Sequence, residues 1–192
     1  MIRTATELEK LATQVLRKAG TAESAAGSVA RALVRANLDG LHSHGLARLK
    51  AYSAQVAAGK VAGEAEPILE KLGPSAARID ANDGFAFPAF DLAIDALVDM
   101  TAETPVAGVA VTNSHHFGVA GPHVERLAER GIVGLVFGNS PAGIAPWGGS
   151  RPLFGTNPIA FGFPRKEAPP VVVDLSLSKQ ARGKIKLAAD EG

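Results

Sequence analysis

The spacing of apolar residues changes at Pro67, and this change constrains the fold more than any other feature of the chain. Before Pro67, apolar side chains recur at helical spacing, and Thr4 or Thr6 can cap the first helix. Three helices are expected there, at residues 4–20, 21–40 and 43–59. After Pro67, short apolar runs alternate with amphipathic segments. This order predicts an α/β protein with a helical N-terminal part.

The elements expected after Pro67 are short. Strands are expected at residues 68–72, 77–79, 106–112, 132–137, 159–163 and 171–173, and helices at 90–100, 118–129 and 178–189. The strands at 106–112, 132–137 and 171–173 consist mainly of apolar and β-branched residues, so we expect them to be buried. The stretch 141–158 is rich in Gly and Pro and predicts a long loop with a regular element near Leu153.

Composition narrows the classes of function. Apolar residues make up 46% of the chain, charged residues 20%, and the formal net charge is +1. No basic run indicates a nucleic-acid partner, and no apolar stretch reaches the roughly 18 residues that span a bilayer. The opening MIRTATELEK lacks the apolar core of a signal peptide, and the absence of Cys excludes thiolate chemistry. We therefore expect a cytoplasmic protein with no nucleic-acid and no membrane partner.

A first group of polar residues follows Ser43. On a continuous helix at about 100° per residue, His44, Arg48 and Tyr52 fall within roughly 80° of one another, opposite an apolar face. Arg can bind a carboxylate with two parallel hydrogen bonds, and His and Tyr can hydrogen-bond or protonate a neighbouring oxygen. The trio therefore suits a small carboxylate substrate, although the same spacing is found on ordinary solvated helix faces.

A second group lies in VAVTNSHHFGVAG, where a predicted strand ends at Asn113 and a helix begins near Gly118. Ligands usually bind at strand ends in α/β sheets. A His near the N-terminus of a helix should have a lowered pKa, which favours the neutral base that alcohol oxidation needs. The alternative is that His115 or His116 is a core residue bonded to the backbone.

Two further groups follow later strands. Ser140 comes after the strand 132–137, and Thr156 and Asn157 end the long loop, so their side chains can bind phosphates or ribose hydroxyls. The alternative is a surface loop of turn residues. In VVVDLSLSKQARGK, a predicted buried strand ends at Asp174, whose carboxylate can hold ribose hydroxyls. Asp174 or Ser176 can equally cap the helix expected at 178–189.

Some motifs are absent from the sequence. Without GxGxxG, a Rossmann dinucleotide fold is not supported. His42 and His44 have metal-ligand spacing for a strand, but no Cys or Glu cluster accompanies them, so no metal site is expected.

Four segments together resemble the malate/L-lactate dehydrogenase family of the second type. They are LDGLHSHGLARLKAY, VTNSHHFGVAG, NSPAGIAPWGGSRPLFGTNPIAFGFPR and DLSLSKQARGKI. This non-Rossmann family also includes ureidoglycolate dehydrogenase, sulfolactate dehydrogenase and Δ1-piperideine-2-carboxylate reductase. The resemblance implies an L-sulfolactate-dehydrogenase-like α/β fold with a mixed sheet, a homodimer, and NAD or NADP as cofactor. It also divides the chain into a helical substrate-site segment, 1–65, and a cofactor-binding domain, 66–192.

The resemblance assigns roles to single residues. His116 matches the family's proton acceptor or donor beside the nicotinamide. His44 and Arg48 match positions in the substrate site, and Tyr52 lies near them in the sequence. Cofactor contacts are implied for Ser140 and for the triplet Asp174, Leu175 and Ser176, whose third position is often Ala in relatives.

The resemblance implies hydride transfer between NAD(P) and a small 2-hydroxy or 2-oxo acid of the malate/lactate type. An NADPH-dependent reductase of cyclic imines is the alternative, since PLFGTNPIAFGFPR also resembles that branch. Lys184 stands where the imine reductases carry Asp, which favours the hydroxy acid. Family members are considerably longer and contain an LPxGGxKG segment, so we also expect a domain incomplete at its C-terminal end. A truncated, non-catalytic chain is therefore a third reading.

Overall fold

The computed structural model describes residues 3–178 of the chain. The chain forms two compact units, Met1–Gly118 and Val119–Gly192. The first unit joins the helical start to a small sheet, and the second contains a helix and another sheet. The predicted division into a substrate-site segment, 1–65, and a cofactor-binding domain, 66–192, concerns function and stays a prediction.

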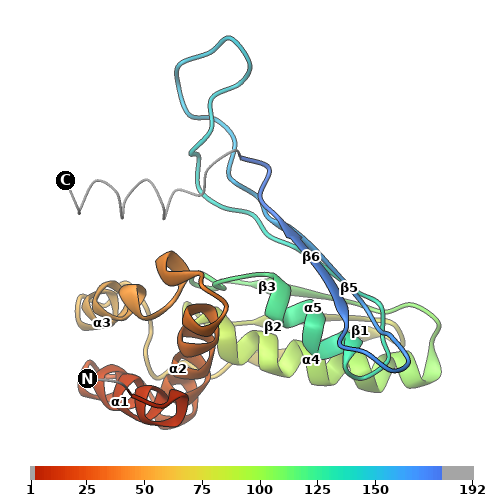
Figure 1. Cartoon of the computed structure of the whole chain (residues 1–192), viewed down its shortest axis with the longest axis horizontal. Coiled ribbons are helices and arrows are strands. Elements are labelled where there is room, and N and C mark those ends of the chain that lie inside the picture. Colours follow the sequence, from red (N-terminus) through yellow and green to blue (C-terminus); the bar gives the residue numbers. More distant parts are fainter. Residues whose placement is uncertain (1–2, 179–192) are drawn as a thin grey trace. The chain divides into compact units, whose positions relative to one another are not determined.

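Four α-helices lie in the described part of the first unit (Figure 1). They are α1 (Ala5–Lys18), α2 (Glu23–Leu38), α3 (Leu49–Ala57) and α4 (Ala86–Glu103). α1 begins at a capping box in which Thr4 and Glu7 exchange hydrogen bonds between side chain and backbone, as Thr4 predicted. Leu16, Leu33 and Tyr52 meet in an apolar core that binds α1, α2 and α3 together.

The predicted third helix, 43–59, is wrong before Leu49. The segment instead forms two 3-10 turns, His42–His44 and Leu46–Arg48, and only then α3. Gly45 separates the turns with extended backbone (φ −93°, ψ −145°). The Leu46 N–H donates to the Asn37 side-chain oxygen at 2.7 Å instead of to a carbonyl one turn earlier. The Asn37 side chain has therefore replaced the backbone acceptor that a helix would supply. The angular positions expected for His44, Arg48 and Tyr52 on one continuous helix do not apply.

The sheet of the first unit is mixed, as predicted. Its strands are β1 (Ile68–Gly73), β2 (Ala76–Asp80) and β3 (Gly108–Thr112), in the order β1-β2-β3. β1 and β2 form an antiparallel hairpin, and β3 returns parallel to β2 after the crossover helix α4. The alanines Ala89 and Ala93 of α4 pack on Ile79 and Ala81 at one face of the sheet. With one face covered, β3 alternates between exposed and half-buried residues instead of being buried throughout.

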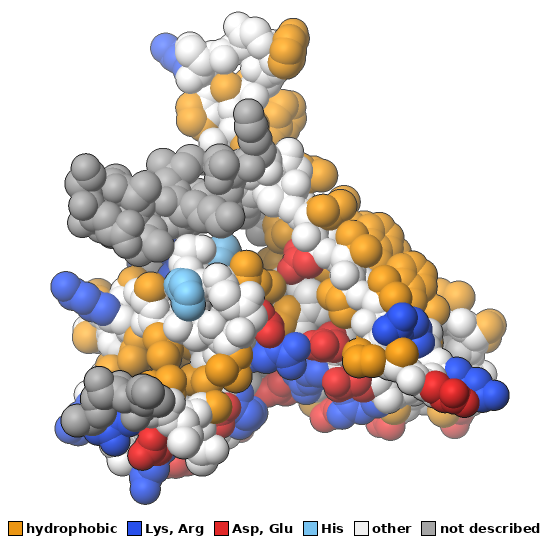
Figure 2. All heavy atoms as spheres, in the orientation of Figure 1, with side chains coloured by type: hydrophobic (Ala, Val, Ile, Leu, Met, Phe, Trp, Pro, Cys, Tyr) orange, Lys and Arg blue, Asp and Glu red, His pale blue; other side chains and the backbone are white. Residues whose placement is uncertain are grey.

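The second unit packs one helix on an antiparallel sheet. Its elements are α5 (Gly121–Ala128), β4 (Gly134–Phe137), β5 (Ile159–Phe163) and β6 (Val171–Leu175). Val124 and Leu127 of α5 and Ala160 of β5 are buried. The prediction that β4 and β6 are buried strands is wrong, because within the described part of the unit a single helix covers the sheet and every residue of β6 is exposed. Figure 2 shows hydrophobic side chains at the surface along β6.

The long loop 141–158 has little regular structure. Ile144 and Phe154 form an isolated β-bridge, which is the regular element expected near Leu153. The predicted helix 178–189 and Lys184 lie outside the described residues. None of the helices within 3–178 combines the length and apolar character that a bilayer crossing demands.

Candidate active site

The turns that carry His44 and Arg48 are held by polar contacts within the first unit. The Arg48 Nε–H donates to the Ser43 carbonyl oxygen at 2.7 Å, which fixes the base of the guanidinium. The Ser43 hydroxyl lies 3.1 Å from His44 Nδ1. Asn37 of α2 binds the same segment through the Leu46 N–H. The two functional side chains therefore project from short turns that a neighbouring helix positions. In Figure 2, histidine side chains reach the surface over this region.

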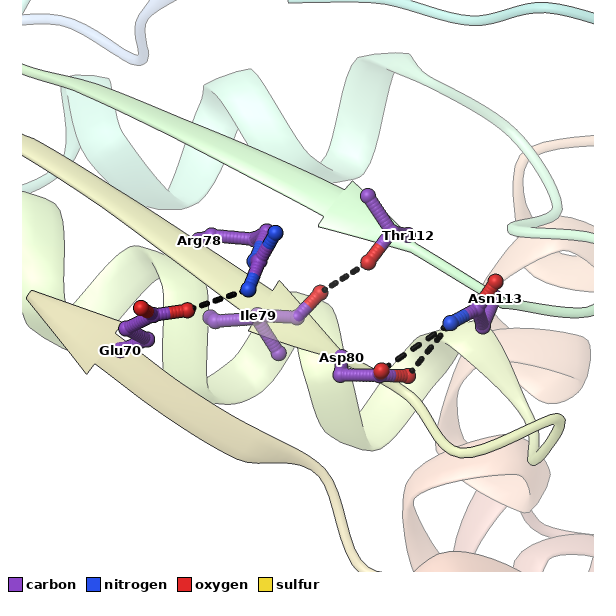
Figure 3. Close-up of polar contacts among 6 residues, drawn as sticks. All are labelled: Glu70, Arg78, Ile79, Asp80, Thr112 and Asn113. Carbon is purple, nitrogen blue, oxygen red and sulfur yellow. Dashed lines mark hydrogen bonds and ion pairs between the residues drawn. The ribbon is translucent and has the colours of Figure 1, made fainter. Parts of the chain in front are cut away.

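A second set of contacts positions the segment that follows β3. Asn113 ends the strand with φ +47°, and its side-chain amide donates to both carboxylate oxygens of Asp80, at 3.1 and 3.0 Å (Figure 3). Its carbonyl oxygen accepts from the Asp83 N–H at 2.8 Å, and the His115 N–H donates to the Gly84 carbonyl oxygen at 2.9 Å. The loop after β2 therefore sets the direction in which the two histidines leave the sheet.

The charge of Asp80 strengthens this arrangement. A hydrogen bond from the Asn82 backbone N–H, followed by the one from the Asn113 side chain, lowers the pKa of the Asp80 carboxyl. The carboxylate is therefore ionised at neutral pH and accepts both bonds as an anion, which makes them stronger than neutral ones.

Three of the four predicted catalytic side chains make direct contact in the first unit. The Tyr52 hydroxyl lies 2.6 Å from His116 Nδ1. The rings of His44 and His116 are stacked, with centroids 5.9 Å apart and planes 25° apart. His115, to which the resemblance assigned no role, packs edge-on against Tyr52 at 5.0 Å. Residues from α3, a 3-10 turn and the end of a strand thus form one cluster.

The cluster changes the protonation of its members. Burial raises the pKa of the Tyr52 hydroxyl, and the nearby Arg48 charge lowers it by less. His116 as a whole residue is exposed, but partial desolvation of its ring, then the charge of Arg48, then His44 and His115 lower its pKa well below 6.5. The predicted lowering of a histidine pKa is confirmed, but its main cause is desolvation and not the start of a helix. At pH 7 the cluster therefore holds a neutral imidazole and a neutral phenol.

Arg48, the fourth predicted residue, acts on the cluster by its charge. It contributes to the pKa values of Tyr52, His115 and His116. Among residues 3–178 no carboxylate lies within ion-pair distance of its guanidinium. A half-buried guanidinium beside neutral proton carriers can bind an anionic group and hold it next to an acid or base.

Sequence reasoning missed several residues that build the site. Asn37, Asp80 and Asn113 position the segments that carry the candidate catalytic residues. Asn113 had a usable signal, because Asn at the end of a strand commonly adopts positive φ. Asn37 and Asp80 had none, since their partners lie 9 and 33 positions away.

The second unit brings together four of the six predicted cofactor-binding residues. The Ser140 hydroxyl accepts from the Thr156 N–H at 2.8 Å and lies 3.0 Å from the Thr156 hydroxyl. The Ser140 N–H donates to the Asn157 side-chain oxygen at 3.0 Å. The Ser176 hydroxyl donates to the Thr156 carbonyl oxygen at 3.2 Å. These residues come from the ends of β4 and β6 and the start of β5.

Asp174 and Leu175 occupy different surroundings in the same unit. One carboxylate oxygen of Asp174 accepts from the Gly121 N–H at 2.7 Å, at the N-terminus of α5. Asp174 therefore caps a helix, but a different one from the helix expected at 178–189. The Leu175 side chain is exposed. Within residues 3–178, no three His, Asp or Glu side chains are grouped as metal ligands.

Comparisons with known proteins identify relatives of the chain. The (2R)-3-sulfolactate dehydrogenase (NADP(+)) of Chromohalobacter salexigens is 50% identical over 186 residues, which cover 97% of this chain and 56% of the relative. The crystal structure of Δ1-piperideine-2-carboxylate reductase from Pseudomonas syringae matches with a TM-score of 0.94 and 40% identity, over 100% of this chain and 58% of that one.

A third match settles the predicted fold. Sulfolactate dehydrogenase from Methanocaldococcus jannaschii matches with a TM-score of 0.89 and 30% identity, over 100% of this chain and 55% of that one. The prediction of a sulfolactate-dehydrogenase-like α/β fold is therefore confirmed. The chain spans just over half the length of these relatives. Residues 4–192 match the sequence model of malate/L-lactate dehydrogenase, and the chain therefore belongs to the malate/L-lactate dehydrogenase family.

Proposed function

We propose that the protein transfers a hydride between NAD or NADP and the C2 carbon of a small 2-hydroxy or 2-oxo acid. The observation that carries the proposal is the cluster in the first unit, in which His116, His44 and Tyr52 meet beside the charge of Arg48. That charge has no carboxylate partner among residues 3–178. A 2-hydroxy acid needs these two functions next to each other, because its carboxylate and its reacting oxygen are on adjacent carbons.

Arg48 binds the substrate carboxylate in this proposal. The guanidinium has five N–H donors, and among residues 3–178 only the Nε–H is engaged, by the Ser43 carbonyl oxygen. The terminal nitrogens can therefore form a bidentate pair with a carboxylate. Anchoring Nε to the backbone reduces the rotamer entropy that such a pair would otherwise lose.

His116 exchanges the proton with the C2 oxygen. Its lowered pKa keeps the imidazole neutral at pH 7, so it can accept the hydroxyl proton during oxidation and become an imidazolium. In reduction, the imidazolium gives this proton to the C2 oxygen and becomes neutral again. The stacked ring of His44 flanks this group and supports the same proton transfer. His44 lies four positions before Arg48 in the sequence, and the charge of Arg48 lowers the pKa of His116. In this proposal, substrate binding and proton transfer therefore occur in one place.

The second unit supplies groups that fit a dinucleotide. The hydroxyls of Ser140 and Thr156, the Asn157 amide and the Ser176 hydroxyl form the kind of donor and acceptor set that ribose and phosphate oxygens need. Asp174 uses one carboxylate oxygen on α5, and the other has no partner among residues 3–178. We propose that these residues and the Leu175 backbone hold the cofactor. When bound, NAD(P) accepts or donates the hydride.

The finer assignments are also proposals. The name of the C. salexigens relative supports NADP as the cofactor and 3-sulfolactate as one of the acids to assay. Cyclic-imine reduction is the second candidate, supported by the match to the P. syringae reductase. A comparison of pyruvate, oxaloacetate and 3-sulfopyruvate with Δ1-piperideine-2-carboxylate, with both reduced nicotinamides, separates the two. We also propose a homodimer in the cytoplasm without a nucleic-acid partner. The family resemblance supports the dimer, and light scattering tests it.

A matched pair of histidine variants tests the main proposal in the full protein. His116→Asn should lower kcat/KM by about 10²–10⁴-fold, the range of general acid–base help. His42→Asn, which changes an exposed histidine of the same unit, should stay within a few-fold of wild type. Near-wild-type turnover of His116→Asn would remove the proposed role. If NADPH does not bind the 192-residue chain at all, the non-catalytic reading is favoured instead.

A further inference from the structure

His116 Nδ1 faces two hydrogen-bond donors in the first unit. The backbone N–H of Gly118 donates to it at 3.3 Å, and the Tyr52 hydroxyl lies 2.6 Å away. A backbone N–H can only donate, so Nδ1 must offer its lone pair and carry no proton. The Tyr52 hydroxyl, which could otherwise accept, must then also donate to Nδ1.

We propose that Tyr52 and Gly118 hold His116 in the tautomer with its proton on Nε2, so that Tyr52 is a positioning residue that acts through His116. This inference rests on the proposed function and refines it, because it assigns the Tyr52 hydroxyl to the His116 imidazole instead of to the substrate. It also names the substrate-facing atom: Nε2–H is the ring donor that has no partner among residues 3–178.

The surroundings of Tyr52 suit a fixed donor. Its side chain is 2% exposed, and its ring packs against Phe85, Phe87 and His115 at centroid distances of 5.6, 6.5 and 5.0 Å. Such packing leaves the phenol little freedom to turn away from His116. Burial also raises the pKa of the hydroxyl, so the phenol keeps its proton throughout the neutral range.

The tautomer has a consequence for the direction of the reaction. An Nε2–H donor matches the carbonyl oxygen of a 2-oxo acid, which accepts a hydrogen bond before the hydride arrives. Oxidation of the 2-hydroxy acid needs the opposite tautomer, with a lone pair on Nε2. The Tyr52 hydroxyl can reverse its role and accept from Nδ1–H, but the Gly118 N–H cannot. The resting arrangement therefore favours binding of the oxidised substrate.

Nitrogen NMR of the imidazole rings tests the proposal without any substrate. In ¹⁵N-labelled full chain above pH 7, His116 should show a protonated Nε2 and a hydrogen-bonded, unprotonated Nδ1. Tyr52→Phe removes one donor to Nδ1 and keeps the ring. It should produce a measurable Nδ1-protonated population and raise the pKa of His116 by about one unit, since a neutral hydrogen bond contributes up to tenfold to such an equilibrium.

A packing control separates this effect from loosening of the core. Phe85→Leu removes volume beside the Tyr52 ring but no hydrogen bond, so the tautomer of His116 should not change. The charged and titratable neighbours Arg48, His44 and His115 stay the same in all variants. A proton on Nδ1 in the wild type overturns the proposal, as does a Tyr52→Phe variant with an unchanged tautomer and pKa. Neither result depends on turnover, so it is distinct from a failure of the proposed activity.

Discussion

Replacing Gly118 with Ala should destabilise the first unit and displace the loop that carries His116. Gly118 has φ +76°, and an added Cβ would lie 2.8 and 3.0 Å from Cε1 and Cζ of Phe87. Phe87 is 3% exposed and belongs to the core that contains Tyr52, so its ring has little room to move. The backbone must therefore shift, and it carries the N–H that donates to His116.

The structure supplies both the magnitude and a matched control. Ala with positive φ costs about 1–2 kcal/mol, and forcing a methyl group into a packed core costs about 1–3 kcal/mol. Gly118→Ala should therefore lower the free energy of unfolding by about 2–5 kcal/mol. Gly40 also has φ +76°, but nothing lies within 4 Å of its added Cβ. Gly40→Ala should show only the first cost, so the difference reports the contact with Phe87.

Urea unfolding followed by far-ultraviolet circular dichroism measures both variants, because α1 to α4 lie in the first unit. The midpoint should fall clearly further for Gly118→Ala than for Gly40→Ala. Gly118→Ala should cost less in a Phe87→Leu background than in the wild type, since the smaller side chain gives the methyl group space. Equal midpoints for the two alanine variants would refute the claim that the Phe87 ring restrains this loop.

Three further outcomes are expected. Asn37→Ala leaves the Leu46 N–H without its partner, so urea unfolding should show a loss of about 1–3 kcal/mol, and an unchanged midpoint would contradict this. Because the folded pKa of His116 is below 6.5, the unfolded chain binds more protons below that pH, and stability is lost as pH falls from about 6.5 towards the folded value. His116→Asn should therefore show a weaker decrease in urea midpoint between pH 7 and pH 5, whereas an equal decrease would exclude this linkage. Ser140→Ala removes the acceptor of the Thr156 N–H, so NADPH titration should show about 5–100-fold weaker binding, and an unchanged Kd would argue against this cluster as a cofactor site.

The sequence by itself was sufficient for the family and the class of fold, and it named the candidate catalytic groups. Helical spacing before Pro67 predicted α1 and α2 nearly to their ends, because caps and periodicity are local properties. The four motifs predicted His44, Arg48, Tyr52 and His116 as one functional set. These residues could be named because their types are the ones that carboxylate binding and proton transfer require.

Other features depended on contacts between distant segments. The hydroxyl of Tyr52 and the ring of His116 are 64 positions apart, so no local pattern could reveal that one orients the other. The break at Gly45 required the Asn37 side chain, which competes with the helical hydrogen bond. The exposure of β4 and β6 depended on how many helices cover the sheet. Periodicity records what a segment prefers, whereas burial, tautomer and pKa are set by whichever atoms the fold places beside it.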